Sequence, residues 1–175
     1  MTRCPDCGAP NDEASCVDYF HTLGVWELEN QLYDVHHLMV LCYHLQHPHL
    51  YSARTLTDAQ GMLVDFVEGG VTSQAMRKKI AKSVDSGVRK HKIAGTSDDH
   101  GAYAQPIAWA MTIADVVAAG RDGYYASVNA WARATLAIAE ATGSSAAQLI
   151  GFGGPMLLPL YTGNRPQLCP PSVLR

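Results

Sequence analysis

The chain has 175 residues, with 13 Lys or Arg against 16 Asp or Glu and a net charge of −3. Hydrophobic residues make up 47% and charged residues 17%, which is typical of one folded domain and not of a disordered chain. The nearly neutral balance argues against nucleic-acid binding, which usually needs a strongly basic face. The sequence lacks an apolar run of the roughly 18 residues that cross a membrane, and its start does not have the pattern of a signal peptide. We therefore expect a soluble, cytoplasmic protein.

The N-terminus contains the motif Cys4-Pro-Asp-Cys7-Gly, followed by Cys16. Two cysteines separated by two residues and followed by a turn-forming glycine are typical of a zinc knuckle, because both thiolates can reach one tetrahedral ion. A redox function fits less well, since a thioredoxin-like site follows a strand and opens a helix, and a disulfide is not expected in a cytosolic chain. We predict a zinc (Zn2+) knuckle in residues 1–16 with Cys4, Cys7 and Cys16 as metal ligands.

The first predicted helix covers residues 16–30, because Ser15 and Asp18 have the spacing of an N-terminal cap. Cys16 then lies in the first turn, where the positive end of the helix favours a thiolate. Glu27 lies in the apolar stripe of this helix, and a carboxylate in such a stripe needs a partner. A helix hairpin would place it near residues 37–39, so we predict a Glu27–His37 acid/base or metal-ligand pair. A salt bridge or an exposed edge position is the alternative.

The second predicted helix runs from a cap at Asp34 to residue 46, and it contains most of a cluster of histidines. Four imidazoles fall within an arc of about 100° on a helical wheel: His36, His37, His44 and His47. The apolar side chains, with Cys42 among them as a small core residue, lie on the opposite side. We expect the histidine face to line a partly enclosed pocket that binds a metal or carries protons; a solvated surface is the alternative.

The fourth metal ligand follows from the pairing of the two helices. In an antiparallel hairpin that turns near residue 32, Cys16 lies opposite residues near 48, which favours His47 over His36 and His37 at the closed end. We expect His47 to be the ligand, with His44 and His21 as the alternatives. Four protein ligands indicate a structural zinc, whereas three ligands and a water indicate a catalytic one.

The rest of the chain predicts further helices and no strand, because no stretch alternates in the manner of a half-buried strand. Helical spacing and caps give helices at 56–68, 112–120 and 122–142, and the fourth helix of the chain begins at Thr72 or Ser73. The apolar stripe of the fourth helix is Met76, Ile80, Val84 and Val88. The stripe of the last helix is Tyr125, Val128, Ala132, Leu136 and Ala139, with Gly143 as its stop. We predict an all-α helical bundle.

Three segments outside these stripes also carry predictions. The seven bases in residues 69–100 indicate a solvated helix face, or else a docking surface for the acidic N-terminal part or an anionic ligand. The loop Asp98-Asp99-His100-Gly101 could fold over the mouth of the bundle and bring His100 to the site. We place the domain in residues 1–143 and a C-terminal extension in 144–175, which is disordered, wraps the bundle, or crosses to a second copy to form a homodimer.

Several motifs together resemble an uncharacterised bacterial domain of unknown function over about residues 3–140. They are the Cys-x-x-Cys knuckle, His36-His37-Leu-x-Val40, Cys42-Tyr-His-Leu-Gln-His-Pro48, His100-Gly-Ala-Tyr103 and Met111-Thr-x-Ala-Asp115-Val. The resemblance implies no established activity. It adds weight to the cysteines and to His36, His37, Gln46, His47 and His100 as positions worth testing.

Two functions follow from these features. The first is a metal-dependent enzyme that acts on a small molecule by hydrolysis or by elimination/addition, with candidate catalytic residues Glu27, His36, His37, His44 and His100. The second is a non-catalytic module that binds a small molecule or a protein and contains a purely structural zinc. Nucleotide-dependent and serine-hydrolase chemistry lack their motifs. An enzyme should show an open coordination position or a histidine pocket, and a module should show a closed four-ligand site with the other histidines on the surface.

Overall fold

The computed structural model describes residues 2–87 and 92–141. The predictions for Val88, for Gly143 and for the extension 144–175 lie outside these residues. In the described part of the chain the protein is helical, and its few β-bridges are isolated. The predicted all-α fold is confirmed. The helices are α1 (Cys16–Asn30), α2 (His36–Gln46), the 3-10 turn η1 (Pro48–Leu50), α3 (Ala53–Val67), α4 (Ser73–Asp85), α5 (Ile113–Ala118) and α6 (Gly120–Ala141).

Local side-chain hydrogen bonds determine where several helices begin. The Asp18 carboxylate accepts from the Ser15 backbone N–H at 2.9 Å, and the Ser15 hydroxyl accepts from the Asp18 N–H, which completes the predicted capping box. Helix α3 begins three residues earlier than predicted because the Ser52 hydroxyl accepts from the backbone N–H of Thr55. The predicted cap at Asp34 is wrong. Val35 occupies the N-cap of α2 without a side-chain hydrogen bond.

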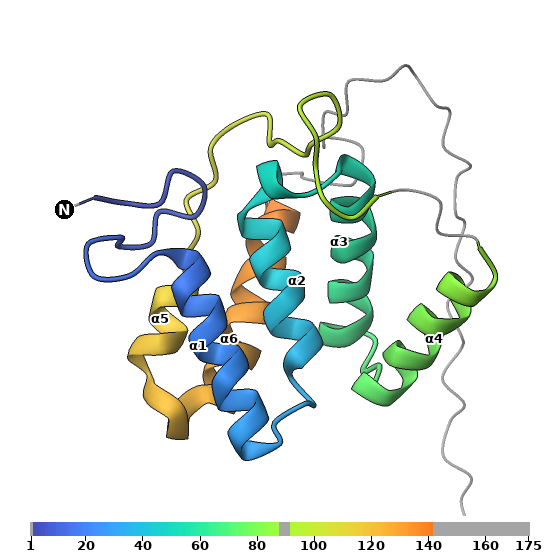
Figure 1. Ribbon diagram of the computed structural model, residues 1–175, viewed down its shortest axis with the longest axis horizontal. Coiled ribbons are helices and arrows are strands. Elements are labelled where there is room, and N and C mark those ends of the chain that lie inside the picture. Colours follow the sequence, from blue (N-terminus) through green and yellow to red (C-terminus); the bar gives the residue numbers. More distant parts are fainter. Residues whose placement is uncertain (1, 88–91, 142–175) are drawn as a thin grey trace, which may run out of the picture.

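Helices α1, α2 and α3 lie side by side with α6 packed behind them, and α2 is at the centre (Figure 1). The core contains Leu23, Leu63 and Trp131, which are all fully buried. In α6 the predicted stripe is correct except at its first residue: Tyr125 is 53% exposed, whereas Tyr124 is fully buried. The buried face is centred on Trp131 and Thr135, so Tyr125 lies at its edge and Tyr124 within it.

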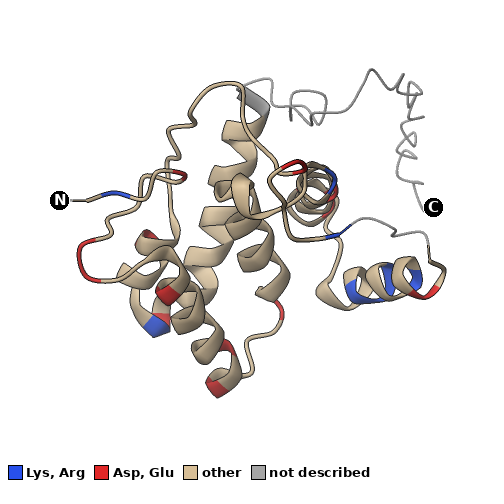
Figure 2. Ribbon diagram, turned by 45° about the horizontal axis from the view of Figure 1, so that its top comes forward, with Lys and Arg blue, Asp and Glu red and all other residues tan. Residues whose placement is uncertain are grey.

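Helix α4 stands at the side of the bundle, beyond α3 (Figure 1). Its buried side chains are Ser73 and Met76, and Val84 of the predicted stripe is 46% exposed. Lys79 Nζ forms an ion pair with Asp65 Oδ2 of α3 at 2.5 Å. Lys and Arg residues are concentrated along α4 in Figure 2, and Arg77, Lys78 and Lys82 are exposed, as in a solvated basic face.

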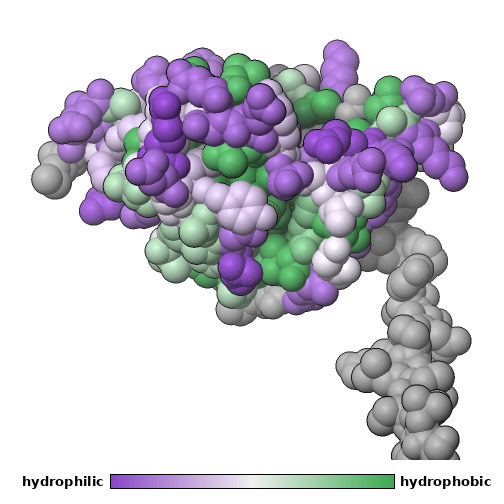
Figure 3. Space-filling model, turned by 90° about the horizontal axis from the view of Figure 1, so that it is seen from below, coloured by the Kyte–Doolittle hydropathy of each residue, from purple (hydrophilic) through white to green (hydrophobic). Residues whose placement is uncertain are grey.

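Apolar side chains remain at the surface in several places. Figure 3 shows apolar patches between hydrophilic residues on one face of the molecule, and Val25 and Leu28 of α1 are 49% and 68% exposed. Within the described residues no helix has the length and apolar character that a membrane span requires.

Candidate metal centre and histidine cleft

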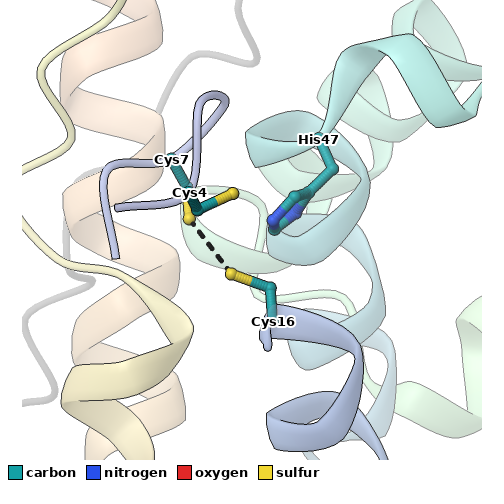
Figure 4. Close-up of side chains that lie close together, drawn as sticks. All are labelled: Cys4, Cys7, Cys16 and His47. Carbon is teal, nitrogen blue, oxygen red and sulfur yellow. Dashed lines mark hydrogen bonds between the residues drawn. The ribbon is translucent and has the colours of Figure 1, made fainter. Parts of the chain in front are cut away.

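Four side chains from three parts of the chain converge at one end of the bundle. Cys4 and Cys7 come from the N-terminal loop, Cys16 from the first turn of α1 and His47 from the end of α2, and all four point toward a common space (Figure 4). One ligand atom from each lies within 4.8 Å of all the others, and every one of these residues is buried. In the described part of the chain this is the one group of three or more His, Cys, Asp or Glu side chains that meets this condition. The predicted set of four ligands is therefore brought together.

The N-terminal loop folds tightly around its two cysteines. The Cys4 backbone N–H donates to the Ala9 carbonyl at 2.8 Å, and the Gly8 N–H donates to the Cys4 carbonyl at 2.9 Å. Gly8 has a φ of 76°, a left-handed conformation that glycine adopts without the strain other residues suffer. This turn brings the two thiols of the Cys-x-x-Cys motif to the same side.

The cysteine sulfurs are close enough to share protons. The Sγ atoms of Cys7 and Cys16 are 3.5 Å apart. The hydrogen bond from Cys16, together with the nearby His47, lowers the pKa of the Cys7 thiol to about 4 against the opposing effect of burial. The same hydrogen bond and burial raise the pKa of Cys16. The arrangement thus favours a thiolate at its centre, and a thiolate is the form that binds metal.

His47 is oriented so that one ring nitrogen faces the cysteines. Its Nδ1–H donates to the Tyr43 carbonyl at 2.9 Å, and the Tyr43 ring stacks on the imidazole with the centroids 4.2 Å apart. The other nitrogen, Nε2, is buried and has no hydrogen-bond partner. A histidine that binds a metal typically donates its second N–H to a carbonyl or carboxylate. The unpartnered Nε2 beside three thiols therefore fits a metal ligand.

The other histidines considered as ligands lie elsewhere. The rings of His44 and Tyr51 lie against each other at a tilt, with the centroids 3.8 Å apart, and His44 lines a cleft instead of joining the cysteines. His21 is exposed on α1. Outside the cluster, His49 Nδ1–H donates to Asp6 Oδ1 at 2.9 Å and ties the knuckle to the turn after α2.

The cleft has a volume of about 840 Å³ and lies between α2, α3 and α4. One wall is the histidine face of α2, which contributes His36, His37, Val40 and His44. The predicted separation of the four histidines is therefore observed, because His47 joins the cysteines and the other three line the cleft. The ligand atoms of these three histidines do not converge on one point in the manner of the cysteine cluster.

Glu27 is the buried carboxylate next to this cleft, and it holds His36 instead of the predicted His37. Its side chain accepts from His36 Nδ1–H at 2.6 Å and from the Tyr124 hydroxyl at 2.6 Å. The hydrogen bond to Glu27 raises the pKa of His36, and burial raises the pKa of Tyr124. Nδ1 is bound to the carboxylate, so Nε2 is the nitrogen of His36 that remains for a ligand in the cleft. Sequence reasoning missed Tyr124, although its position four residues before Val128 places it on the buried face of α6.

The remaining candidate histidines differ in their surroundings. Burial lowers the pKa of His44 to about 4, and burial also lowers the pKa of His37, so both are neutral imidazoles near pH 7. His100 is exposed, and its Nδ1–H donates to the Gly101 carbonyl at 3.2 Å. Its loop packs against residues 50–52 through the hydrogen bond from Gly101 N–H to the Tyr51 carbonyl. The structure therefore does not bring His100 to the histidine face.

The fold and the cluster together define a helical protein with a Cys3His group able to hold a metal ion. The chain belongs to the family of unknown function DUF5946, whose sequence model matches residues 2–139. This confirms the predicted resemblance to a family without an assigned activity. No curated protein and no solved structure gives a significant match.

Proposed function

We propose that the protein is an enzyme in which a structural zinc holds one end of the bundle and His36 acts as general acid/base on a small molecule bound in the cleft. The observation that carries this proposal is the hydrogen bond between buried Glu27 and His36 on the cleft wall. The reaction classes that suit such a site are hydrolysis and elimination/addition, since both need a proton to be moved and neither needs an organic cofactor.

The donor set of the cluster supports zinc in a structural role. Three thiols and one imidazole are typical ligands of a closed tetrahedral zinc site. All four side chains are at most 8% exposed, and none of them lines the cleft. An ion there would link the N-terminal loop to α1 and α2. This proposal places no metal ion at the histidine face, where the sequence left metal binding or proton transfer open.

The Glu27–His36 pair supports acid–base chemistry by fixing the state of the imidazole. The carboxylate holds the proton on Nδ1, so that Nε2 can accept a proton from a bound water or substrate and return it to the leaving group. The hydroxyl of Tyr124 keeps the carboxylate in place from its other oxygen. A buried carboxylate that orients a histidine in this way is a recurring device of acid–base catalysis.

A second candidate is a non-catalytic module that binds its ligand in the same cleft. The closed four-ligand cluster favours it, because a metal held there has no open position for a substrate. The two functions differ in whether His36 accelerates a reaction.

The hydrolysis of p-nitrophenyl acetate, a small neutral ester, distinguishes them. Water and the ester give acetate and p-nitrophenol, and His36 would take the proton of the attacking water. We expect His36→Gln to lower the protein-dependent rate by about 10²-fold, the lower end of the range for general acid–base catalysis. His21→Gln, an exposed histidine of α1 outside the cleft, serves as the matched control and should retain the rate. Equal rates in both variants, with zinc content and fold intact, would reject the enzyme in favour of the binding module.

A further inference from the structure

The charges on the wall of the cleft are balanced, and from this we infer that its ligand is a neutral, largely apolar small molecule with one hydrogen-bonding group at the histidine face. The inference rests on the proposed function, because it names the kind of molecule that the same cleft takes.

The surface of the cleft is mostly apolar. Val40 and Leu41 come from α2, Met62 from α3, and Ile80 and Val84 from α4. A volume of about 840 Å³ lies within the range of roughly 300–1,000 Å³ that is usual for small-molecule sites. Burying an apolar molecule against these side chains removes apolar surface from water on both sides, which is the main source of affinity in such sites.

Each acidic or basic side chain that lines the cleft has a partner of opposite charge. Arg54 Nε lies 3.2 Å from Asp58 Oδ1 within α3. Lys79 of α4 lies 2.5 Å from Asp65 of α3 and spans the two walls. A charged ligand would have to compete with one of these pairs for its counter-ion and would also lose its own hydration.

The histidines add hydrogen-bonding capacity without adding a net charge. His36 is paired with Glu27, and His37 and His44 are neutral near pH 7 because burial lowers their pKa. Arg77 lies outside the lining, and its positive charge contributes to the lowered pKa of His37 and partly opposes the rise that Glu27 causes in the pKa of His36. A neutral ligand with a carbonyl or hydroxyl group could use the ring nitrogens directly.

Fluorescent probes of different charge test the inference on the full chain. We expect the neutral dye Nile red to bind saturably and more tightly than 8-anilinonaphthalene-1-sulfonate, an anion with a fused aromatic body. Val84→Asp introduces an unpaired carboxylate into the lining and should weaken Nile red binding by about tenfold, equivalent to about 1.4 kcal/mol. The matched control is Val25→Asp on α1, because the two valines are 46% and 49% exposed and Val25 lies outside the cleft.

The outcomes separate this inference from the proposed function. The inference of a neutral apolar ligand would be overturned if the sulfonate bound more tightly than Nile red. It would also be overturned if the two aspartate substitutions weakened Nile red binding equally. Neither result bears on the dependence of ester hydrolysis on His36. Conversely, if His36→Gln does not lower the rate of ester hydrolysis while Nile red binding is intact, the enzyme is rejected and the inferred class of ligand is retained. Thermal melting of both aspartate variants establishes that they are folded.

Discussion

Cys7→Ser is expected to abolish stoichiometric zinc binding and to cause the largest loss of stability of any single substitution proposed for this protein. The four ligand atoms lie within 4.8 Å of one another, and a serine hydroxyl does not replace a thiolate on zinc. An ion present at 1,000 times its dissociation constant stabilises the folded state by about 4 kcal/mol. For a chain of this size that corresponds to a decrease in Tm of roughly 8–16 °C. Elemental analysis of the purified variant and thermal unfolding measure the two effects.

Cys42→Ala provides the matched control for this prediction. Cys42 is a fully buried cysteine of α2, as the sequence predicted, and it is not one of the four converging residues. Its substitution should create a small cavity and reduce stability while one zinc per chain remains bound. Zinc retained by Cys7→Ser, or lost equally from Cys42→Ala, would contradict the assignment of the ligands.

The second large loss of stability is expected for Glu27→Gln. Glu27 is 3% exposed and accepts hydrogen bonds from His36 and Tyr124. Hydrogen bonds to a charged group contribute more than neutral ones, and we expect the free energy of unfolding to fall by about 1–3 kcal/mol. His36 is half exposed, so solvent screening weakens its hydrogen bond to Glu27. We therefore expect the hydrogen bond from the buried Tyr124 hydroxyl to account for more of the loss in the free energy of unfolding. Chemical denaturation at neutral pH measures the difference.

The effect of Glu27→Gln should also depend on pH with a definite sign. Glu27 raises the pKa of His36 in the folded protein, so the ion pair stabilises the fold fully below the pKa of an unfolded histidine, about 6.5. This part of the stability is lost as the pH rises through the higher folded-state pKa. The difference in stability between the parent protein and the variant should therefore be larger at pH 5.5, about one unit below the pKa of an unfolded histidine, than at about pH 9.

Glu29→Gln is the control for Glu27→Gln. Glu29 pairs with Arg121, and both side chains are about half exposed, so the expected loss is below about 1 kcal/mol. The proposed role of the buried carboxylate would be contradicted if Glu27→Gln were as stable as Glu29→Gln. It would also be contradicted if the stability lost in Glu27→Gln, relative to the parent protein, increased with pH.

Local sequence signals were sufficient to predict much of the Cys3His cluster. The Cys-x-x-Cys motif with Gly8 predicts the knuckle, the Ser15–Asp18 cap predicts where α1 begins, and this places Cys16 in the first turn. His47 required a tertiary argument, namely that α1 and α2 pair in an antiparallel manner, and the structure brings it to the cysteines. These predictions succeeded because each depends on a short spacing or on the length of one hairpin.

Features that depend on the detailed register of two helices could not be predicted. The pairing of α1 and α2 places His36 against Glu27, one position from the expected His37, because a hairpin argument locates a partner only to within about one helical turn. Tyr124 was missed for a related reason. Its spacing to Val128 indicates the buried face of α6, but the residue that it contacts lies nearly 100 residues earlier in the chain, and no local pattern links the two. The ion pair of the cleft between Lys79 of α4 and Asp65 of α3 likewise depends on how two helices pack, and it has no sequence motif.

The central claim is that the metal has four protein ligands and leaves the chemistry to the cleft. X-ray absorption spectroscopy of the zinc-loaded full chain tests it most directly. We predict three sulfur ligands at about 2.3 Å and one nitrogen ligand at about 2.0–2.1 Å, with a spectrum unchanged by His36→Gln. A coordinated water oxygen in place of a sulfur or of the His47 nitrogen would show an open catalytic metal and contradict the account.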